Sequence, residues 1–187
     1  PAGPPPPLPD YVGPPHFRSF TPTESPERTF PRMYDIVNNV NTIGEILPII
    51  DTTLHFRFTA RDNRVGGGGV NSAFYAIDVT TEAGPFRVSA PNSAVTWLAG
   101  ETQTITWDVA NTTAAPVSCS DVRIDLSTDG GYNYPITLSA STPNDGSQEI
   151  TVPSLATTAA RVRVACLSNI FFDISDADFS ILAPDLT

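Results

Sequence analysis

The chain has 187 residues, 40% of them hydrophobic, which is enough to build one large domain or two small ones. Its formal net charge is -10, and its ten basic residues are all scattered arginines, so we expect no nucleic-acid partner, which would require a clustered basic surface. No apolar run approaches the roughly 20 residues that a membrane span requires, so we expect no membrane insertion.

The N-terminal part is rich in proline. Residues 1–31 hold eleven of the nineteen prolines, and proline fixes φ and lacks a backbone donor. We therefore expect an extended arm with polyproline-like segments, followed by one or two helical turns at residues 33–40. The chain begins at Pro1 without a charged and then apolar leader, which favours a mature or excised piece of a longer protein.

A pattern of period two begins at Thr53. In residues 53–61, "TLHFRFTAR", apolar and polar side chains alternate, and residues 73–80 repeat this alternation after a glycine-rich loop. The simplest interpretation is a β-hairpin with a mobile tip. The four glycines at positions 66–69 are followed by no Lys-Ser/Thr pair, so they do not predict a phosphate-binding loop.

Residues 85–187 read as short strands separated by turns. About eight strands in about a hundred residues is the density of a β-sandwich. The side chains predicted to face its core are Ile105, Trp107, Val109, Val122, Ile124 and Leu126. The fold class is therefore all-β.

One turn has the appearance of a functional motif. Ser127, Asp129, Gly131 and Tyr134 have the spacing of the Asp-box hairpin of sialidases and many unrelated β-proteins, where it is structural. Ser127 and Asp129 can close the hairpin with side-chain hydrogen bonds, and Gly130 and Gly131 tolerate positive φ. We predict a turn rather than a ligand site.

The two cysteines, Cys119 and Cys166, are too far apart for a metal knuckle or a redox pair. They form a disulfide or remain as two buried thiols. Cys166 shares a strand face with Val162 and Val164, which points it into the core. We favour the disulfide, and with it an extracytoplasmic protein.

Two groups of oxygen-bearing side chains are candidates for Ca²⁺. The first is Asp173, Asp176 and Asp178; the second is Asp62, Asn63 and Asp78, which we expect near the base of the hairpin. Neither has EF-hand spacing, and solvated turn carboxylates are the simpler interpretation. No other cofactor is predicted.

Several phrases, in order, carry a resemblance: "FRSFTPTESPERTFPR", "LHFRFTARDN", "AGPFRV", "TITWDVANTTAAPV", "IDLSTDGGYNYPITL" and "NIFFDISDADFSI". They are similar to the paired Ig-like modules that follow the catalytic domain in secreted bacterial zinc metallopeptidases of the reprolysin-like, metzincin type. The resemblance covers nearly the whole chain. It implies a proline-rich arm with a partial Ig/PKD-like module at residues 1–84 and an Ig-like or fibronectin-like sandwich at residues 85–187.

Such modules are accessory, and no H-E-x-x-H zinc motif occurs here. The two histidines, His16 and His55, lie far apart on unlike segments. In contrast to antibody domains, Trp107 precedes both cysteines instead of lying between them.

The expected function is therefore that of a non-catalytic spacer, or of a module for attachment to substrate or surface. Its partners would be other modules of the parent protein and extracellular protein or polysaccharide. One alternative is a structural adhesin or surface-layer repeat. Another is a carbohydrate-binding module, for which Tyr11, Tyr132 and Tyr134 are the candidate aromatic residues.

The predicted hairpin also lacks covering strands, because two strands cannot bury their apolar side chains alone. We expect it to pack on the sandwich, to borrow an edge from a neighbouring molecule, or to leave its edges exposed.

Overall fold

A computed structural model describes residues 16–21, 23–25 and 27–183, which form two compact units. The first unit comprises the described residues up to Thr21 and Ile43–Thr81. The second comprises the described residues of 23–42 together with the chain from Glu82 onward. Residues 1–15, which hold Tyr11 and eight of the eleven prolines of the predicted arm, lie outside the described residues.

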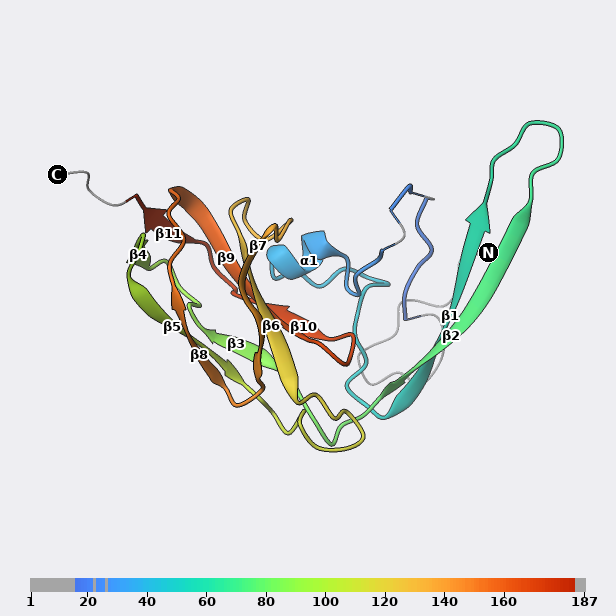
Figure 1. Ribbon diagram of the computed structural model, residues 1–187. Helices are drawn as coiled ribbons and strands as arrows, with labels where there is room; N and C mark the ends of the chain where they lie inside the picture. Colours follow the sequence, from blue (N-terminus) through green and yellow to red (C-terminus); the bar gives the residue numbers. More distant parts are fainter. Residues whose placement is uncertain (1–15, 22, 26, 184–187) are drawn as a thin grey trace. The chain divides into compact units, whose positions relative to one another are not determined.

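The first unit contains the predicted hairpin (Figure 1). Strands β1 (Thr52–Arg61) and β2 (Val70–Val79) pair antiparallel in an unbroken register from Thr52 opposite Val79 to Arg61 opposite Val70. The alternation of side chains in the sequence therefore predicts this sheet correctly. Midway along the hairpin, Phe56 packs against Phe17 with ring centroids 6.0 Å apart.

The second unit is built from two sheets. The smaller has the order β3-β5-β8, formed by Arg87–Ala90, Thr102–Asp108 and Ser147–Thr151. The larger sheet has six strands. Five of them follow one another in the order β4 (Thr96–Leu98), β11 (Phe179–Leu182), β9 (Thr157–Cys166), β6 (Asp121–Ser127) and β7 (Ile136–Pro143). The sixth, β10 (Phe172–Ile174), also pairs with β9. Only the β4–β11 pairing is parallel among these strands.

The inner faces of the two sheets form one apolar core. Its buried residues include Val88, Ile105 and Trp107 from the smaller sheet and Val122, Ile124, Leu126, Val162, Val164, Phe179 and Ile181 from the larger. The predicted all-β sandwich is confirmed. The sequence missed only β4, which is three residues long.

Trp107 is a core residue, as predicted, and its one polar atom has a buried partner. The indole Nε1 donates to Asn144 Oδ1 at 2.8 Å. The Nδ2 of Asn144 in turn donates to Thr112 Oγ1 and to the carbonyl of Cys119, both at 3.0 Å. Satisfying the indole and the amide in this way offsets the cost of taking them out of water.

Cys119 and Cys166 form the predicted disulfide, with 47 residues of sequence separation. Cys119 precedes β6 and Cys166 ends β9, and these strands are neighbours in the larger sheet. The bond therefore ties two strands of one sheet, whereas the disulfide of antibody domains joins two sheets.

Helix α1 (Met33–Val37) confirms the predicted helical turns, and it belongs to the second unit with the sandwich. This differs from the predicted division of the chain, which placed residues 1–84 together. The physical reason is that Asp35 and Val37 are 2% and 6% exposed within this unit. No helix in the described part of the chain is long and apolar enough to cross a membrane.

Candidate functional site

The turn after β6 is built by the hydroxyl of Ser127 and the carboxylate of Asp129. Ser127 Oγ donates to Asp129 Oδ1 at 2.7 Å and accepts from the backbone N–H of Gly131 at 2.9 Å. Asp129 accepts from the backbone N–H groups of Tyr132 and Asn133 and from Asn133 Nδ2 at 3.1, 3.0 and 2.6 Å. These bonds close the turn internally, which is the arrangement predicted from the spacing.

The hydrogen bonds also set the charge state of this turn. Burial alone would raise the pKa of Asp129, but the bonds from Asn133, Ser127 and Tyr132 outweigh it and lower the pKa to about 2. Gly130 and Gly131 adopt φ of 77° and 95°, which L side chains rarely adopt. Asp129 is therefore an anionic cap on its own loop.

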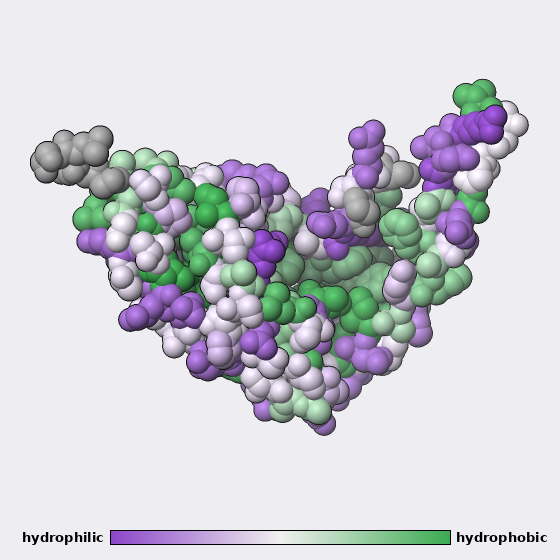
Figure 2. Space-filling view, viewed as in Figure 1, coloured by the Kyte–Doolittle hydropathy of each residue, from purple (hydrophilic) through white to green (hydrophobic). Residues whose placement is uncertain are grey.

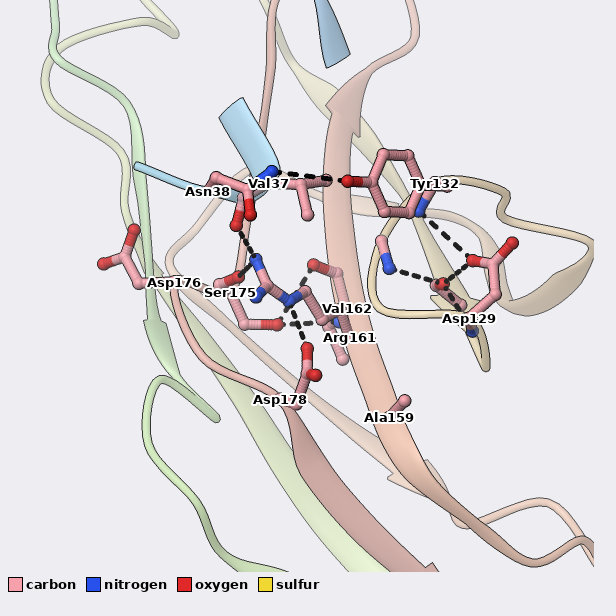
Figure 3. Close-up of polar contacts among 12 residues, drawn as sticks. Val37, Asn38, Asp129, Tyr132, Ala159, Arg161, Val162, Ser175, Asp176 and Asp178 are labelled. Atoms are coloured by element: carbon pink, nitrogen blue, oxygen red, sulfur yellow. Dashed lines mark hydrogen bonds and ion pairs between the residues drawn. The ribbon is translucent and has the colours of Figure 1, made fainter. Parts of the chain in front are cut away.

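Next to this turn, Arg161 of β9 holds helix α1 against the outer face of the larger sheet (Figure 3). Its Nε pairs with Asp178 Oδ1 at 2.6 Å, and its Nη1 donates to the carbonyls of Val37 at 2.9 Å and Ser175 at 3.3 Å. The Arg161 side chain is 9% exposed and that of Asp178 43%. The guanidinium is thus a buried connector.

The amides that follow α1 add two bonds to the same surface. Asn38 Nδ2 donates to the Tyr132 hydroxyl at 3.3 Å, and Asn39 Nδ2 donates to the carbonyl of Asp176 at 3.1 Å. A Cβ on Gly131 would lie 3.0 Å from Arg161 Cδ and 3.3 Å from Val37 Cγ2. The turn, β9 and α1 therefore meet at a point where only glycine fits without displacement.

A second charged cluster, which sequence reasoning missed, surrounds Asp125. This carboxylate is fully buried on the outer face of β6 and pairs with Arg123 Nε at 2.7 Å and Arg163 Nη2 at 2.9 Å. Thr137 Oγ1 donates to it at 3.1 Å. The only sequence signal is the spacing of Arg123 and Asp125, which share one face of β6. Arg163 lies opposite Asp125 on β9.

Of the predicted carbohydrate-binding aromatic residues in the described part of the chain, only Tyr132 is exposed. Tyr134 is half-buried, and the guanidinium of Arg163 lies 4.6 Å from its ring centroid. Burial raises the pKa of its hydroxyl well above the ordinary value. Tyr132 is 47% exposed and accepts the bond from Asn38.

The three aspartates of the first calcium candidate have three different partners. Asp173 Oδ2 accepts from the backbone N–H of Val88 at 2.7 Å, Asp176 accepts from Asn92 Nδ2 at 2.8 Å, and Asp178 binds Arg161. No group of three His, Cys, Asp or Glu side chains that could hold a metal occurs among the described residues. Calcium binding here stays a prediction without a formed site behind it.

Asp173 differs from its neighbours in its burial. Removal from water raises its pKa to about 6, although the bonds from Val88 and Ile174 act in the opposite direction. Since Val88 belongs to the smaller sheet and Asp173 to β10 of the larger, the carboxylate links the two sheets at one edge.

The prediction that the second group of calcium candidates meets near the base of the hairpin is wrong, because its members lie at opposite ends of the hairpin. Asp62 and Asn63 follow β1 at the tip, whereas Asp78 lies opposite Thr53 near the open end. Asp62 lies nine positions after Thr53, a distance of roughly 30 Å along an extended strand. Asp62 instead accepts from the backbone N–H of Arg64 at 3.1 Å, and backbone hydrogen bonds to Arg64 and Gly69 lower its pKa.

Taken together, the buried Arg161 and Asp125 and the exposed Asp129 hold elements of the sandwich itself in place. Arg161 holds α1, Asp125 joins two neighbouring strands through their arginines, and Asp129 closes a turn. A comparison with models of protein families finds none that matches the chain, and a comparison with curated proteins finds no match either.

Proposed function

We propose that this chain is a non-catalytic accessory module of a secreted metallopeptidase, acting as a spacer or in attachment to substrate or surface. The observation that carries the proposal is that its most site-like residues serve the fold. Ser127 and Asp129 bond to their own turn, and Arg161 bonds to Val37 and Asp178. A structural use for this constellation fits an accessory module, and the resemblance of the sequence supplies the class of parent protein.

An extracytoplasmic setting belongs to the same proposal. The Cys119–Cys166 disulfide persists most readily in oxidising compartments, outside the reducing cytosol. The parent protein would therefore be secreted or held at the cell surface.

The hairpin supports a role in attachment. Large hydrophobic side chains stand exposed on both of its faces: Phe58 is 51% exposed, Tyr75 62% and Phe74 75%. Figure 2 shows hydrophobic residues at the hairpin surface among hydrophilic ones. Exposed aromatic side chains rimmed by polar residues are typical of surfaces that contact other macromolecules.

A pull-down of the 187-residue chain against collagen, insoluble polysaccharide and cell-surface preparations, each with and without chelator, tests this proposal. We expect retention on one of them, and loss of retention in Phe74→Ser. Leu98→Ser, which changes an exposed leucine of the sandwich, is the matched control.

Three outcomes would redirect the interpretation. Retention on polysaccharide that is lost in Tyr132→Ala and kept in Phe74→Ser would favour the carbohydrate-binding alternative. Retention that chelator abolishes would support calcium. Peptide or glycoside hydrolysis by the purified chain would contradict a non-catalytic role.

A further inference from the structure

The outer edge of β1 presents a row of backbone groups that no other strand pairs with in the part of the chain that the structure describes. The backbone N–H of Asp62 donates to the carbonyl of Gly69 at 3.3 Å, which fixes the direction of the groups along the strand. Because these directions alternate in an antiparallel ladder, even-numbered residues of β1 face β2. The backbone groups of Thr53, His55, Arg57 and Thr59 therefore face outward.

The hairpin also presents an apolar face that ends at this edge. Leu54, Phe56 and Phe58 alternate along β1 and lie opposite Ile77, Tyr75 and Ala73 of β2. Phe58 and Tyr75 remain more than half exposed. A strand added to β1 would extend this face, and at least three strands are needed for a stable sheet of this kind.

The sequence of β1 is complementary to itself in one antiparallel register. When a two-fold axis passes through Phe56, the two copies of β1 overlap along the whole strand. Every outward-facing odd-numbered residue then lies opposite another odd-numbered residue. Asp51 then lies opposite Arg61 of the second copy at both ends, Thr53 lies opposite Thr59, and His55 lies opposite Arg57. Centring the axis on Arg57 would instead set two arginines against each other.

The apolar face benefits from the same register. Phe56 meets Phe56 of the second copy at the axis, and Leu54 meets Phe58. Aromatic pairs, aromatic–aliphatic pairs, Thr–Thr pairs and opposite charges are the cross-strand neighbours that stabilise antiparallel sheets. Arg61 makes no side-chain hydrogen bond or ion pair among the described residues, and Asp51 is exposed while accepting from the backbone N–H of Thr81.

We propose that β1 pairs antiparallel with β1 of a second copy of this chain about a two-fold axis at Phe56. The product is a four-stranded sheet of order β2-β1-β1-β2 with a continuous apolar face. The interface is isologous, as in most homodimers. It is independent of the proposed role in a metallopeptidase, since it rests only on the hairpin.

Disulfide trapping in the full chain tests the register. Both native cysteines are bonded to each other, so a single introduced cysteine carries the only free thiol. Across the axis, the Cα atoms of a non-hydrogen-bonded pair lie about 4.5 Å apart, within the range of a disulfide. Phe56→Cys should give a covalent dimer on non-reducing gels, and Phe58→Cys, which faces Leu54 of the second copy, should not.

Sedimentation of proline variants tests the edge without relying on Phe56. Thr59→Pro removes an outward N–H of β1 and should weaken the dimer by at least about tenfold, because two symmetry-related hydrogen bonds are lost. Ala76→Pro removes an outward N–H from the opposite edge of the hairpin and should leave the dissociation constant unchanged.

The charges at the two ends supply a rescue. Arg61→Asp should weaken the dimer, and adding Asp51→Arg should restore it. A wild-type chain that sediments as a monomer at all concentrations up to the millimolar range would overturn the proposal. So would equal trapping of Phe56→Cys and Phe58→Cys, or a dimer sensitive to Ala76→Pro and indifferent to Thr59→Pro.

Discussion

Arg161, in the middle of β9, donates a 2.9 Å hydrogen bond from Nη1 to the main-chain carbonyl of Val37, 124 residues earlier in the chain. The same guanidinium pairs with Asp178, and the Val37 residue to which it bonds is buried. One side chain thus connects α1, β9 and the loop before β11.

We expect Arg161→Met to destabilise the second unit by about 1.5 to 3 kcal/mol, the range for hydrogen bonds to charged groups. Loss of protection from amide hydrogen exchange at residues 35–40 should accompany it, because those backbone groups lose their attachment. Arg87→Met removes an exposed arginine of β3 and should change the free energy of unfolding by less than about 0.5 kcal/mol. Unchanged exchange at residues 35–40 in Arg161→Met would contradict this role.

Ser127→Ala should destabilise the sandwich by about 1 to 3 kcal/mol, because the buried N–H of Gly131 loses its acceptor. Urea denaturation measures the change. The exposed Ser141→Ala is the matched control and should behave as the wild type. A Ser127→Ala protein with wild-type stability and weakened binding to an extracellular ligand would instead indicate a ligand site.

Replacing both Cys119 and Cys166 with alanine should lower the free energy of unfolding by about 4 kcal/mol, the chain-entropy estimate for a loop of this length. Reduction of the wild-type protein with dithiothreitol should give a similar loss. Mass spectrometry of the unreduced protein should detect no free thiol. Equal stability with and without reductant would show that the bond does not constrain the unfolded chain.

Because Asp173 is buried, we predict that its contribution to the free energy of unfolding changes with pH in the direction opposite to that of an ion-paired carboxylate. Its pKa is about 6 in the folded protein, above the ordinary aspartate value of 3.8, so the folded protein binds the proton more tightly than the unfolded chain does. Its ionisation therefore costs stability above pH 6, up to about 3 kcal/mol, and this cost disappears as the pH falls towards 4.

Asp173→Asn should remove that cost and flatten the dependence of the unfolding free energy between about pH 4 and 6. Chemical denaturation at several pH values across this range and at neutral pH measures it, with the exposed Asp145→Asn as control. A variant that is less stable than the wild type at neutral pH would show that the ionised carboxylate is favourable where it stands.

The strands could be predicted because their information is local. Alternation fixed the positions of β1, β5, β6 and β9, and the spacing of Ser127 and Asp129 identified their turn. Strand β4 was missed because three residues are too short to display a period, whereas the equally short β10 lies within the longer apolar segment 169–175.

What could not be predicted depends on contacts between distant segments. Nothing near Arg161 in the sequence indicates that its partner is Val37, and Asp125 reads as an ordinary surface residue of β6 until the arginines and Thr137 surround it. The misplaced group of Asp62, Asn63 and Asp78 has a different origin. The predicted hairpin already excluded this group, because in its register residues near the loop cannot meet residues near the open end.

The disulfide within the larger sheet has a consequence for mechanical load. Strands β6, β7 and β8 and all of β9 lie between Cys119 and Cys166. Tension applied along the chain passes through the sulfur atoms and bypasses this loop. About 160 Å of contour length in the loop is therefore not extended. A pulled chain would therefore lengthen only by its outer segments, and the looped strands would stay covalently closed within the tether until a reductant opened the bond.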